Sequence, residues 1–412
     1  MVTTSSSGKL VVVGAGQAGA AAAVMLRQSG YGGSITLLGD ELHLPYRRPP
    51  LSKAYLRGSA NFESLRLWPD SHYKRLQIAL YLGTLVEGID RGAKHVITSE
   101  GNFDYDTLIL ATGSRARKLS IADVSLRGVL ELRSLDDANA LHALMRPNIR
   151  LVLIGGGYVG LESAATARSL GAEVVLLERE GRLLARVASE PLAHFFEEFH
   201  RDRGVHIVCA AEVQELRGTA DGQVNGVVLR DGRCFAADVV VVGVGAMACD
   251  SLAIGAGLAC QNGIVVDERA QTSDPSIFAI GDATSRPLTA CGGRMFRLES
   301  VPNALEQARQ AANAILGLAP PIPEVPWFWS DQYDSKLQIA GVPFDRDALV
   351  IRGSTQAGKF SIFHLSARRL VCVEAVNSSS DFAWGKKLIG AGREVSASLL
   401  ADTEVDIKSL AV

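Results

Sequence analysis

One segment of this chain occurs twice, and the repeat constrains the fold more than any other feature. The first copy is LVVVGAGQAGAAAAVMLRQSG at Leu10 to Gly30, and the second is LVLIGGGYVGLESAATARSLG at Leu151 to Gly171. The two copies align without a gap. Each has four apolar residues typical of a buried strand, a glycine-rich turn, an alanine-rich helical stretch and a glycine that ends the helix. The repeat predicts two βαβ units.

The glycine-rich turn of the first copy reads GAGQAG over residues 14–19. In this spacing the first glycine allows a tight turn, the second lets the backbone approach a pyrophosphate, and the third lets the helix pack closely on the strand. The amino terminus of the helix then receives the phosphate charge. Because a strand precedes the turn and a helix follows it, we predict a dinucleotide site here.

The second turn, GGGYVG at residues 155–160, predicts a second dinucleotide site. Glu178 follows 23 residues after Gly155, at the end of the next apolar strand. A carboxylate there accepts a hydrogen bond from a ribose 2′-hydroxyl and repels a 2′-phosphate, which favours NADH over NADPH. Three nearby arginines leave NADPH open as an alternative, namely Arg179, Arg182 and Arg186.

The ribose acid of the first site is less clear. When the repeats are aligned, Gly39 and not an acid stands opposite Glu178. Asp40 or Glu41 is the candidate acceptor for the adenosine ribose, and a solvated turn is the alternative.

Further strands extend the alternating α/β pattern up to about residue 320. Three apolar, strand-like stretches each run into a glycine turn, at 106–111, 238–242 and 276–280. Beyond residue 320 a proline-rich segment comes first, and further strand-like runs follow it at 349–351, 360–365 and 370–375. The predicted class is α/β, with two Rossmann-like dinucleotide-binding domains and a C-terminal α+β domain. The predicted boundaries are 8–117 with 244–324 for the first dinucleotide domain, 118–243 for the second, and 325–412 for the C-terminal domain.

Composition excludes several partner classes. The 412 residues are 47% hydrophobic, enough for several cores, and the formal net charge of -2 gives no general attraction to nucleic acid or an acidic membrane. The apolar runs are far shorter than the roughly 20 residues that span a bilayer. Residues 1–8 lack the pattern of a signal peptide, so we expect a cytoplasmic protein.

The six cysteines contain no CxxC or CxxxxC pair. A reductase that relays electrons through its own disulfide needs two neighbouring thiols, and none follows the first glycine turn. We therefore expect reduced, buried cysteines and no metal site.

Two further segments resemble the glutathione-reductase-type flavoproteins. They are TSDPSIFAIGDA at residues 272–283 and ATGS at residues 111–114. The resemblance implies that Asp282 accepts a hydrogen bond from the ribityl chain of FAD. Both segments lie outside the second repeat, so the first turn is assigned to FAD and the second to NADH.

Three longer segments narrow this resemblance to the FAD-dependent ferredoxin reductases of bacterial oxygenase systems. They are YRRPPLSKAYL at 46–56, ESVPNALEQAR at 299–309 and PWFWSDQY at 326–333, and the similarity covers nearly the whole chain. The family's activity is hydride transfer from NADH to FAD, followed by single-electron transfer to a [2Fe-2S] ferredoxin. The expected cofactor-binding residues are Gly14, Ala15, Gly16, Ala18, Gly19, Asp40, Arg48, Lys53, Val86, Ala111, Thr112, Gly113, Arg133, Gly155, Gly157, Tyr158, Val159, Gly160, Glu162, Glu178, Arg186, Gly281, Asp282, Val301 and Trp329.

Lys53 and Glu162 are the candidate catalytic residues. Lys53 lies where a disulfide flavoenzyme places its redox cysteines, and a buried cation beside the flavin would stabilise the reduced, anionic ring. Glu162 could pair with it, because an unpaired buried ammonium is costly. The alternative is a surface lysine and a helix-facing glutamate.

Other side chains have two or three interpretations each. Tyr158 either shields the flavin or packs without gating, and Trp327 with Trp329 shares one face of an extended segment that covers the flavin, docks a partner or packs in a core. A basic docking patch for an acidic ferredoxin is one interpretation of several cations, and solvated surface is the other. These cations are Arg309, Arg368, Arg369, Lys386, Lys387 and Arg393.

Alternative functions share the fold. A rubredoxin reductase or an NADH oxidase differs only in its electron acceptor. A flavoprotein that acts mainly in signalling, as apoptosis-inducing factor does, differs in class.

Overall fold

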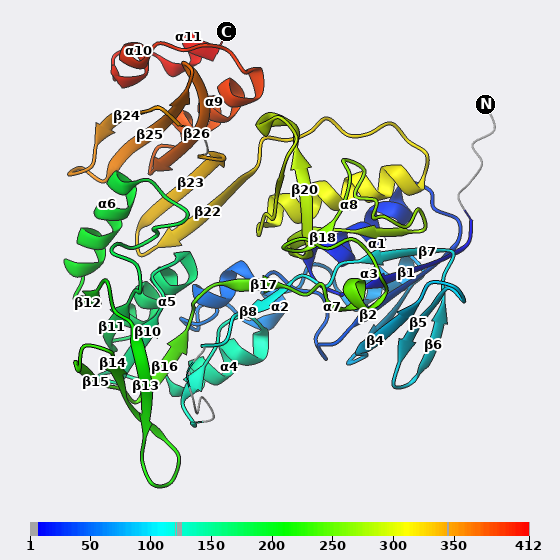
Figure 1. Cartoon of the computed structure of the whole chain (residues 1–412), viewed down its shortest axis with the longest axis horizontal. Coiled ribbons are helices and arrows are strands. Elements are labelled where there is room, and N and C mark those ends of the chain that lie inside the picture. Colours follow the sequence, from blue (N-terminus) through cyan, green and yellow to red (C-terminus); the bar gives the residue numbers. More distant parts are fainter. Residues whose placement is uncertain (1–6, 120, 122–125, 344–345, 412) are drawn as a thin grey trace. The chain divides into compact units, whose positions relative to one another are not determined.

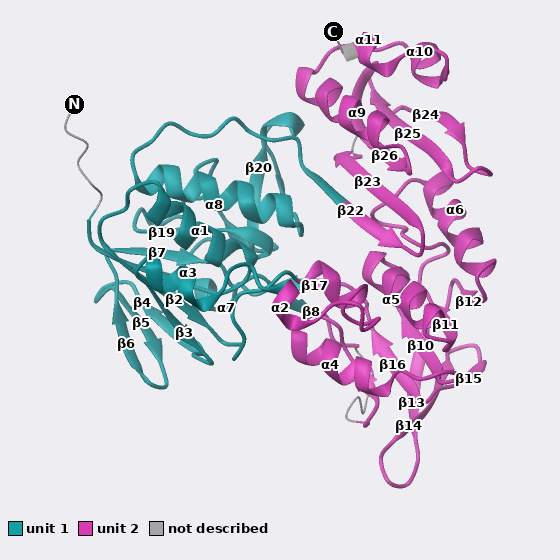
Figure 2. Cartoon of the chain, turned by 180° about the vertical axis from the view of Figure 1, so that it is seen from behind, with its two compact units in different colours: residues 1–47, 65–115, 247–328 teal, residues 48–64, 116–246, 329–412 magenta. Residues whose placement is uncertain are grey.

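The structure is a computed structural model that describes residues 7–119, 121, 126–343 and 346–411 (Figure 1). The absence of a signal peptide was predicted from residues 1–8, most of which lie outside this described part. The chain forms two compact units (Figure 2). Unit 1 comprises residues 1–47, 65–115 and 247–328, and unit 2 comprises residues 48–64, 116–246 and 329–412.

Unit 1 is built on a five-stranded parallel sheet in the order β19-β7-β1-β2-β3. Both faces are buried, because alternate residues of β1 pack into two different cores: Leu10 and Val12 on one side, Val11 and Val13 on the other. Helices α1 and α8 lie together against the first of these faces. The bounds are β1 Lys9–Val13, β2 Ser34–Gly39, β3 Ile78–Leu82, β7 Thr107–Leu110, β19 Ile277–Ala279, α1 Gln17–Gln28 and α8 Val301–Ile315.

Two small sheets and several short helices complete unit 1, and only the first of these sheets is antiparallel throughout. Strands β4 (Val86–Asp90), β5 (His95–Thr98) and β6 (Gly101–Asp104) form one sheet, and β18, β20 and β21 form another. The remaining elements are β18 Ile264–Val265, β20 Thr284–Leu288, β21 Arg294–Phe296, α3 Asp70–Arg75, α7 Ser251–Gly255, η2 Gly281–Ala283 and η3 Thr289–Cys291.

Unit 2 contains a second parallel sheet in the order β12-β11-β10-β16-β9. Its strands are valine- and leucine-rich over their whole length, as expected for strands covered on both faces. An antiparallel sheet, β13-β14-β15, packs against one face. The bounds are β9 Val129–Leu130, β10 Arg150–Ile154, β11 Glu173–Leu177, β12 Val205–Val208, β16 Val239–Val242, β13 Val213–Gly218, β14 Val224–Leu229, β15 Cys234–Ala236, η1 Pro49–Ser52, α4 Leu135–Leu144, α5 Tyr158–Ser169 and α6 Glu190–Arg201.

The last part of unit 2 is a five-stranded sheet in the order β22-β23-β26-β25-β24, in which β23, β26, β25 and β24 pair antiparallel. Helix α9 covers it through β23 and β26. The bounds are β22 Trp327–Gln332, β23 Ser335–Gly341, β24 Ala348–Ser354, β25 Lys359–Ser366, β26 Arg369–Val376, α9 Ser379–Ala391, α10 Ala397–Ala401 and α11 Ile407–Ala411. Four elements contain a chain boundary between the units, namely α2 Phe62–Leu65, β8 Ser114–Ala116, β17 Ala246–Ala248 and β22, whose first two residues belong to unit 1.

The predicted class, with two Rossmann-like units and a mixed C-terminal part, is confirmed. The predicted domain boundaries remain a prediction, because the two compact units divide the chain differently. Residues 48–64 lie in unit 2, whereas the sequence assigned them to the first dinucleotide domain.

Candidate functional site in two dinucleotide-binding turns

The first glycine turn joins β1 to α1 at the carboxyl end of the sheet. Gly14 has a φ of 109°, a conformation that other residues rarely adopt, and an added Cβ would lie 2.2 Å from the carbonyl oxygen of Ala111. A Cβ on Gly19 would lie 2.0 Å from the carbonyl oxygen of Gly14. These two glycines are therefore required by the close packing of helix on strand.

Gly16 differs from its neighbours because a Cβ there would meet no atom within 4 Å. It is the N-cap residue of α1, whose first backbone N–H groups have no helical partner. Open space in front of unpaired N–H groups at a helix amino terminus is what a bound phosphate requires. The residues of this turn therefore fit a dinucleotide.

Neighbouring strands end beside this turn. Ala111, Thr112 and Gly113 follow β7, where Ala111 donates from its N–H to the carbonyl oxygen of Val13, 2.7 Å away. The hydroxyl of Thr112 donates to the carbonyl oxygen of Cys249 at 2.6 Å. The carboxyl ends of parallel strands thus form one edge, where ligands of such sheets bind.

Asp282 lies at the same edge, in η2 directly after β19. Its carboxylate accepts a hydrogen bond from the Ser114 hydroxyl at 3.2 Å, and Gly281 donates from its N–H to the buried Gln307 side chain at 2.8 Å. A φ of 78° at Gly281 shapes the turn. The residues Ala18, Val86 and Val301 also lie in unit 1, at α1, β4 and the start of α8.

The second glycine turn repeats this geometry in unit 2. Gly155 has a φ of 114°, and an added Cβ would lie 2.3 Å from the carbonyl oxygen of Gly243. A Cβ on Gly160 would lie 2.2 Å from the carbonyl oxygen of Gly155, whereas one on Gly157 would meet nothing within 4 Å. This turn also fits a dinucleotide, and half of the Val159 side chain is exposed beside it.

Glu178 is held rigidly at the end of β11. Its carboxylate accepts from the N–H of Gly156 at 2.6 Å and from the N–H of Glu180 at 2.8 Å. Each oxygen keeps further accepting capacity, since a carboxylate has about four acceptor sites. The acid is therefore positioned before a ribose arrives.

The corresponding place in the first turn is occupied differently. A Cβ on Gly39 would lie 2.6 Å from the Cβ of Ala15, and a Cβ on Gly156 would lie 3.2 Å from the Cβ of Glu178. In the first turn Ala15 faces Gly39, and in the second turn Gly156 faces Glu178. The glycine thus stands at the end of the second strand in one unit and inside the glycine turn in the other. Gly39 is required because the Ala15 side chain fills the space that an acid would need.

The two acids after Gly39 differ in their surroundings. Glu41 accepts a hydrogen bond from the Tyr46 hydroxyl at 2.6 Å, whereas Asp40 is exposed at the end of β2. Asp40 is therefore the acid better placed to accept from a ribose.

The arginines near Glu178 have other contacts or point outward. Arg179 pairs with Glu180 at 2.9 Å, and Arg182 donates to three backbone carbonyl groups within its own loop. Arg186 is exposed. Two of the three cations are thus occupied, which favours the carboxylate of Glu178 as the group that a ribose meets.

Lys53 and Glu162 form a buried ion pair within unit 2. The ammonium lies 2.7 Å from the carboxylate, and the two side chains are 17% and 6% exposed. Glu162 also accepts from the hydroxyl of Ser52 at 2.6 Å and from that of Ser330 at 2.6 Å. The predicted pair is present, and the interpretation of Lys53 as an isolated surface lysine is wrong.

Sequence reasoning missed the hydroxyl groups around this pair. The hydroxyl of Thr166 in α5 donates to the carbonyl oxygen of Ser52 at 2.8 Å. This bond fixes the η1 turn, and Lys53 is the residue directly after that turn. Ser330 is separated from Glu162 by 168 residues, so no local pattern links them. The alternation of β22 gave the only signal, since Ser330 and Gln332 share its buried face.

The remaining expected contacts from the resemblance lie in unit 2. Arg48 donates to the carbonyl oxygen of Arg133 at 2.8 Å, and both side chains are half-buried. Trp329 is half-buried in β22. Their roles toward FAD remain predictions.

Tyr158 begins α5 and donates from its hydroxyl to the carbonyl oxygen of Val187 at 3.3 Å. Burial, together with the nearby Glu374 and Cys372, raises the pKa of the phenol well above its usual value. The ring is therefore tied within unit 2 as a neutral group, and gating stays a prediction.

All six cysteines, each in the described part of the chain, are free thiols, but the expectation that they are buried is wrong for four of them. Cys291 and Cys372 are buried, whereas Cys234 is exposed and the other three are half-buried. Burial raises the pKa of Cys209 and of Cys291 to about 11, so these thiols are protonated at neutral pH. Because the thiolate is the reactive form, these side chains are unsuited to a redox relay.

The cations suggested for docking are mostly exposed, and several have partners. Arg309 lies 3.4 Å from Glu324, and Arg368 lies 3.3 Å from Glu394. The ammonium of Lys387 stands 3.8 Å from the centre of the Trp384 ring. A docking role for these residues remains a prediction.

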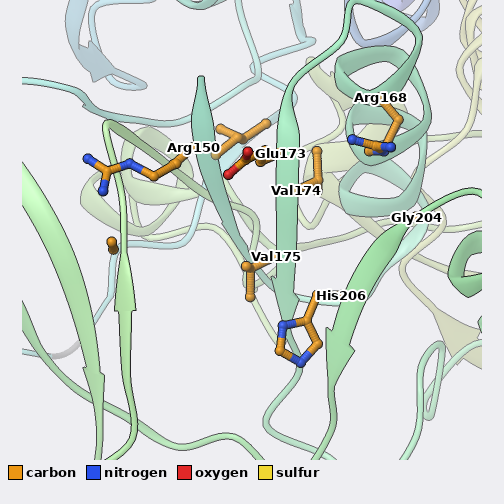
Figure 3. A pocket seen from close by; sticks show the side chains of 9 residues that line it. Arg150, Arg168, Glu173, Val174, Val175, Gly204 and His206 are labelled. Atoms are coloured by element: carbon orange, nitrogen blue, oxygen red, sulfur yellow. The ribbon is translucent and has the colours of Figure 1, made fainter. Parts of the chain in front are cut away.

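A pocket in unit 2 lies at the other end of the second parallel sheet (Figure 3). Arg150 and Glu173 begin β10 and β11 there, and Gly204 precedes β12. Arg150 is paired with Asp238, and Arg168 donates to backbone carbonyl groups. The pocket is therefore at the amino end of the strands, opposite the glycine turn.

Across the described residues, no group of three or more His, Cys, Asp or Glu side chains is arranged to hold a metal ion. Within the same part of the chain, no helix has the length and apolar character needed to cross a membrane.

Comparisons with known proteins agree with this geometry. Residues 8–308 match the pyridine nucleotide-disulphide oxidoreductase family, and residues 327–411 match the reductase C-terminal family. The chain is 47% identical to a probable ferredoxin reductase, CtmF, of Castellaniella defragrans, over 98% of this chain and 99% of the relative. It is 42% identical to putidaredoxin reductase CamA of Pseudomonas putida, over 97% of this chain and 96% of the relative.

A solved structure gives the same result for the fold. The covalent putidaredoxin reductase-putidaredoxin complex contains a chain that is 41% identical, with a TM-score of 0.96 and 98% of both chains covered. The protein therefore belongs to the pyridine nucleotide-disulphide oxidoreductase family and carries a reductase C-terminal domain.

Proposed function

We propose that this protein is an NADH-dependent ferredoxin reductase of a bacterial oxygenase system. The observation that carries the proposal is the combination of two dinucleotide turns with six free cysteines, among which burial raises the pKa values of Cys209 and Cys291. Without a disulfide to receive them, electrons from the second site leave the protein through FAD. Relatives of 42–47% identity over nearly the whole chain are named ferredoxin reductases.

In this proposal unit 1 binds FAD through Gly14, Gly16 and Gly19, with Asp40 on the ribose and Asp282 on the ribityl chain. Unit 2 binds NADH through Gly155, Gly157 and Gly160, with Glu178 on the ribose. Bound FAD would supply the chemistry that converts a hydride into two single electrons. The overall reaction balances, because one NADH and two oxidised [2Fe-2S] ferredoxins give NAD+, a proton and two reduced ferredoxins.

Lys53 is proposed as the cation beside the flavin. The ion pair with Glu162 keeps its ammonium in one position, because both oxygens of the carboxylate are fixed by hydroxyl donors. A fixed charge that needs no reorganisation is the most effective way to stabilise developing negative charge. Neither residue transfers a proton in this role.

The test is reduction of added ferredoxin under steady-state conditions. Purified protein with bound FAD is expected to bleach its flavin absorbance with NADH and much less with NADPH. Cytochrome c reduction by NADH is expected to depend on a [2Fe-2S] ferredoxin from a neighbouring gene. Equal rates with rubredoxin, or full NADH oxidation by oxygen alone, would contradict the proposal in favour of the other acceptors.

A cytoplasmic location is part of the proposal. Six free cysteines support it, since exposed thiols such as Cys234 persist in reducing compartments. Fractionation with antibody detection tests this location.

A further inference from the structure

A chain of buried hydrogen bonds runs through unit 2 and ends on Glu162. It passes from α6 through β22 to α5, elements that lie next to one another in Figures 1 and 2. His200, Gln332 and Ser330 are its members, and they are 0%, 0% and 1% exposed. Of these three, only the Ser330 hydroxyl enters the function proposed above, as one of the two donors that fix Glu162.

The direction of each hydrogen bond follows from which side-chain atoms carry a hydrogen. Gln332 donates from its amide nitrogen to the Ser330 hydroxyl oxygen at 3.2 Å. The Ser330 hydroxyl has a single hydrogen, and it donates this hydrogen to Glu162 at 2.6 Å. The amide oxygen of Gln332 is then the acceptor for Nε2 of His200, 2.8 Å away. Every hydrogen in the chain points toward the carboxylate.

His200 begins this chain as a neutral imidazole. Burial lowers the pKa of its ring to about 4, so the ring carries one hydrogen at neutral pH. That hydrogen is on Nε2, because Nε2 faces the amide oxygen of Gln332, which can only accept. A neutral donor at the far end brings no second positive charge toward Lys53. The only charge in contact with the Glu162 carboxylate within the described part of unit 2 is therefore the ammonium, at 2.7 Å.

We infer that Ser330 is a positioning residue that holds the Glu162 carboxylate, and through it the Lys53 ammonium, in the orientation used beside the flavin. The inference rests on the role proposed for Lys53. Ser330 supplies the donor for one oxygen of the carboxylate, while Ser52 and Lys53 share the other. Without Ser330 the carboxylate is free to rotate away, and an unsatisfied buried oxygen favours that rotation.

The strand that carries Ser330 also carries Trp329 on its opposite face. The serine therefore anchors β22 to α5 from the side that faces away from Trp329. Removal of the Ser330 hydroxyl removes its hydrogen bond to Glu162. The direct effect is therefore on the ion pair between Glu162 and Lys53.

The experiment uses the full-length FAD protein with Ser330→Ala, Ser330→Thr, Glu162→Gln and Lys53→Met. Ser335→Ala is the matched control, because Ser335 is 3% exposed on the adjacent strand β23 and its hydroxyl has no hydrogen-bond partner among the described residues. The readouts are the flavin midpoint potential, measured by dye-linked reductive titration, and the rate of flavin reduction by NADH in stopped flow.

Ser330→Ala is expected to lower the midpoint potential in the direction given by Lys53→Met and to slow flavin reduction about tenfold at unchanged apparent NADH affinity. Ser330→Thr restores the hydroxyl and is expected to restore the potential. In a Glu162→Gln background, Ser330→Ala is expected to change nothing further, since two residues that act through one interaction are not additive.

A Ser330→Ala potential equal to that of Ser335→Ala, or an additive effect on top of Glu162→Gln, would overturn the inference. An unchanged potential in Lys53→Met would overturn both this inference and the role of Lys53. In that case ferredoxin-dependent turnover of the wild type, measured in parallel, still decides whether the protein is a ferredoxin reductase.

Discussion

The N–H of Gly156 donates a hydrogen bond to the carboxylate of Glu178 across 2.6 Å. This contact joins the glycine turn to the acid that follows the next strand, so the two ends of one βαβ unit fix each other. The acid is oriented by backbone and not by a mobile side chain. The discrimination between NADH and NADPH that is proposed for Glu178 would therefore rest on the rigid part of the fold.

Glu178→Gln is expected to weaken the preference for NADH. The substitution removes the negative charge that repels a 2′-phosphate and one hydrogen bond to a charged group, which contributes about 1.5–3 kcal/mol. The kcat/KM for NADH should fall roughly tenfold or more, and that for NADPH should rise. Glu180→Gln is the control, because Glu180 pairs with Arg179 in solvent. An unchanged ratio of the two kcat/KM values would contradict this role.

The opposite arrangement in the first turn gives a second prediction. Gly39→Ala places a Cβ 2.6 Å from that of Ala15, and overpacking of this kind costs about 1–3 kcal/mol. The double variant Ala15→Gly, Gly39→Ala is expected to recover most of that free energy of unfolding. Urea titration and the FAD content of the purified protein are the measurements. Equal destabilisation of the single and double variants would show that the two positions do not face each other.

Substitutions of two glycines in the second turn are expected to have different effects. Gly157→Ala should fold normally but bind NADH poorly, because its Cβ would occupy open space that the pyrophosphate needs. Gly160→Ala should destabilise the whole unit, because its Cβ would lie 2.2 Å from a carbonyl oxygen. Circular dichroism separates these outcomes from the apparent NADH affinity in flavin bleaching.

Lys53→Met is expected to lower the free energy of unfolding by about 3 kcal/mol, because it leaves the buried Glu162 carboxylate without its counter-ion. The double variant Lys53→Met, Glu162→Gln should be more stable than Lys53→Met alone, since no buried charge remains. Denaturant unfolding at pH 7 checks both values. If the double variant were less stable than Lys53→Met, an uncompensated charge would not be the cause.

His200 predicts a loss of stability in mild acid. The folded pKa of about 4 lies below the ordinary value of 6.5, so the unfolded chain binds the extra proton first as pH falls. Stability should decrease from about pH 6.5 down to about pH 4, by about 3 kcal/mol in total. His200→Asn should flatten this part of the profile, whereas substitution of the exposed His206 should not. Urea unfolding between pH 4 and pH 7 is the measurement.

Much of the fold was predictable because short segments of the sequence are enough to identify its strands. The apolar runs at Leu10, Leu151 and Val239 are strands covered on both faces, and such strands differ in composition from everything around them. The glycine turns were predictable for the same reason. Spacing within six residues is enough to specify each one.

The partners of the site were not predictable because they come from distant parts of the chain. Ser330 reaches Glu162 across 168 residues, and Gly39 is explained only by the side chain of Ala15, on another element. The cost of an unpaired buried ammonium suggested that Lys53 and Glu162 pair, but the hydroxyl groups that hold them become evident only in the tertiary structure. Contacts of this kind depend on tertiary structure and leave no periodic trace in the sequence.

The order of strands in the two parallel sheets has a consequence for synthesis on the ribosome. In unit 1 the strand β19, at residues 277–279, pairs with β7 at residues 107–110, so the sheet stays incomplete until most of the chain has been made. The parallel sheet of unit 2 uses only residues 129–242 and can close earlier. The nucleotide site that comes first in the sequence thus belongs to the sheet that is completed last. Until β19 has been synthesised, the edge of β7 has no strand to pair with and must be protected from aggregation.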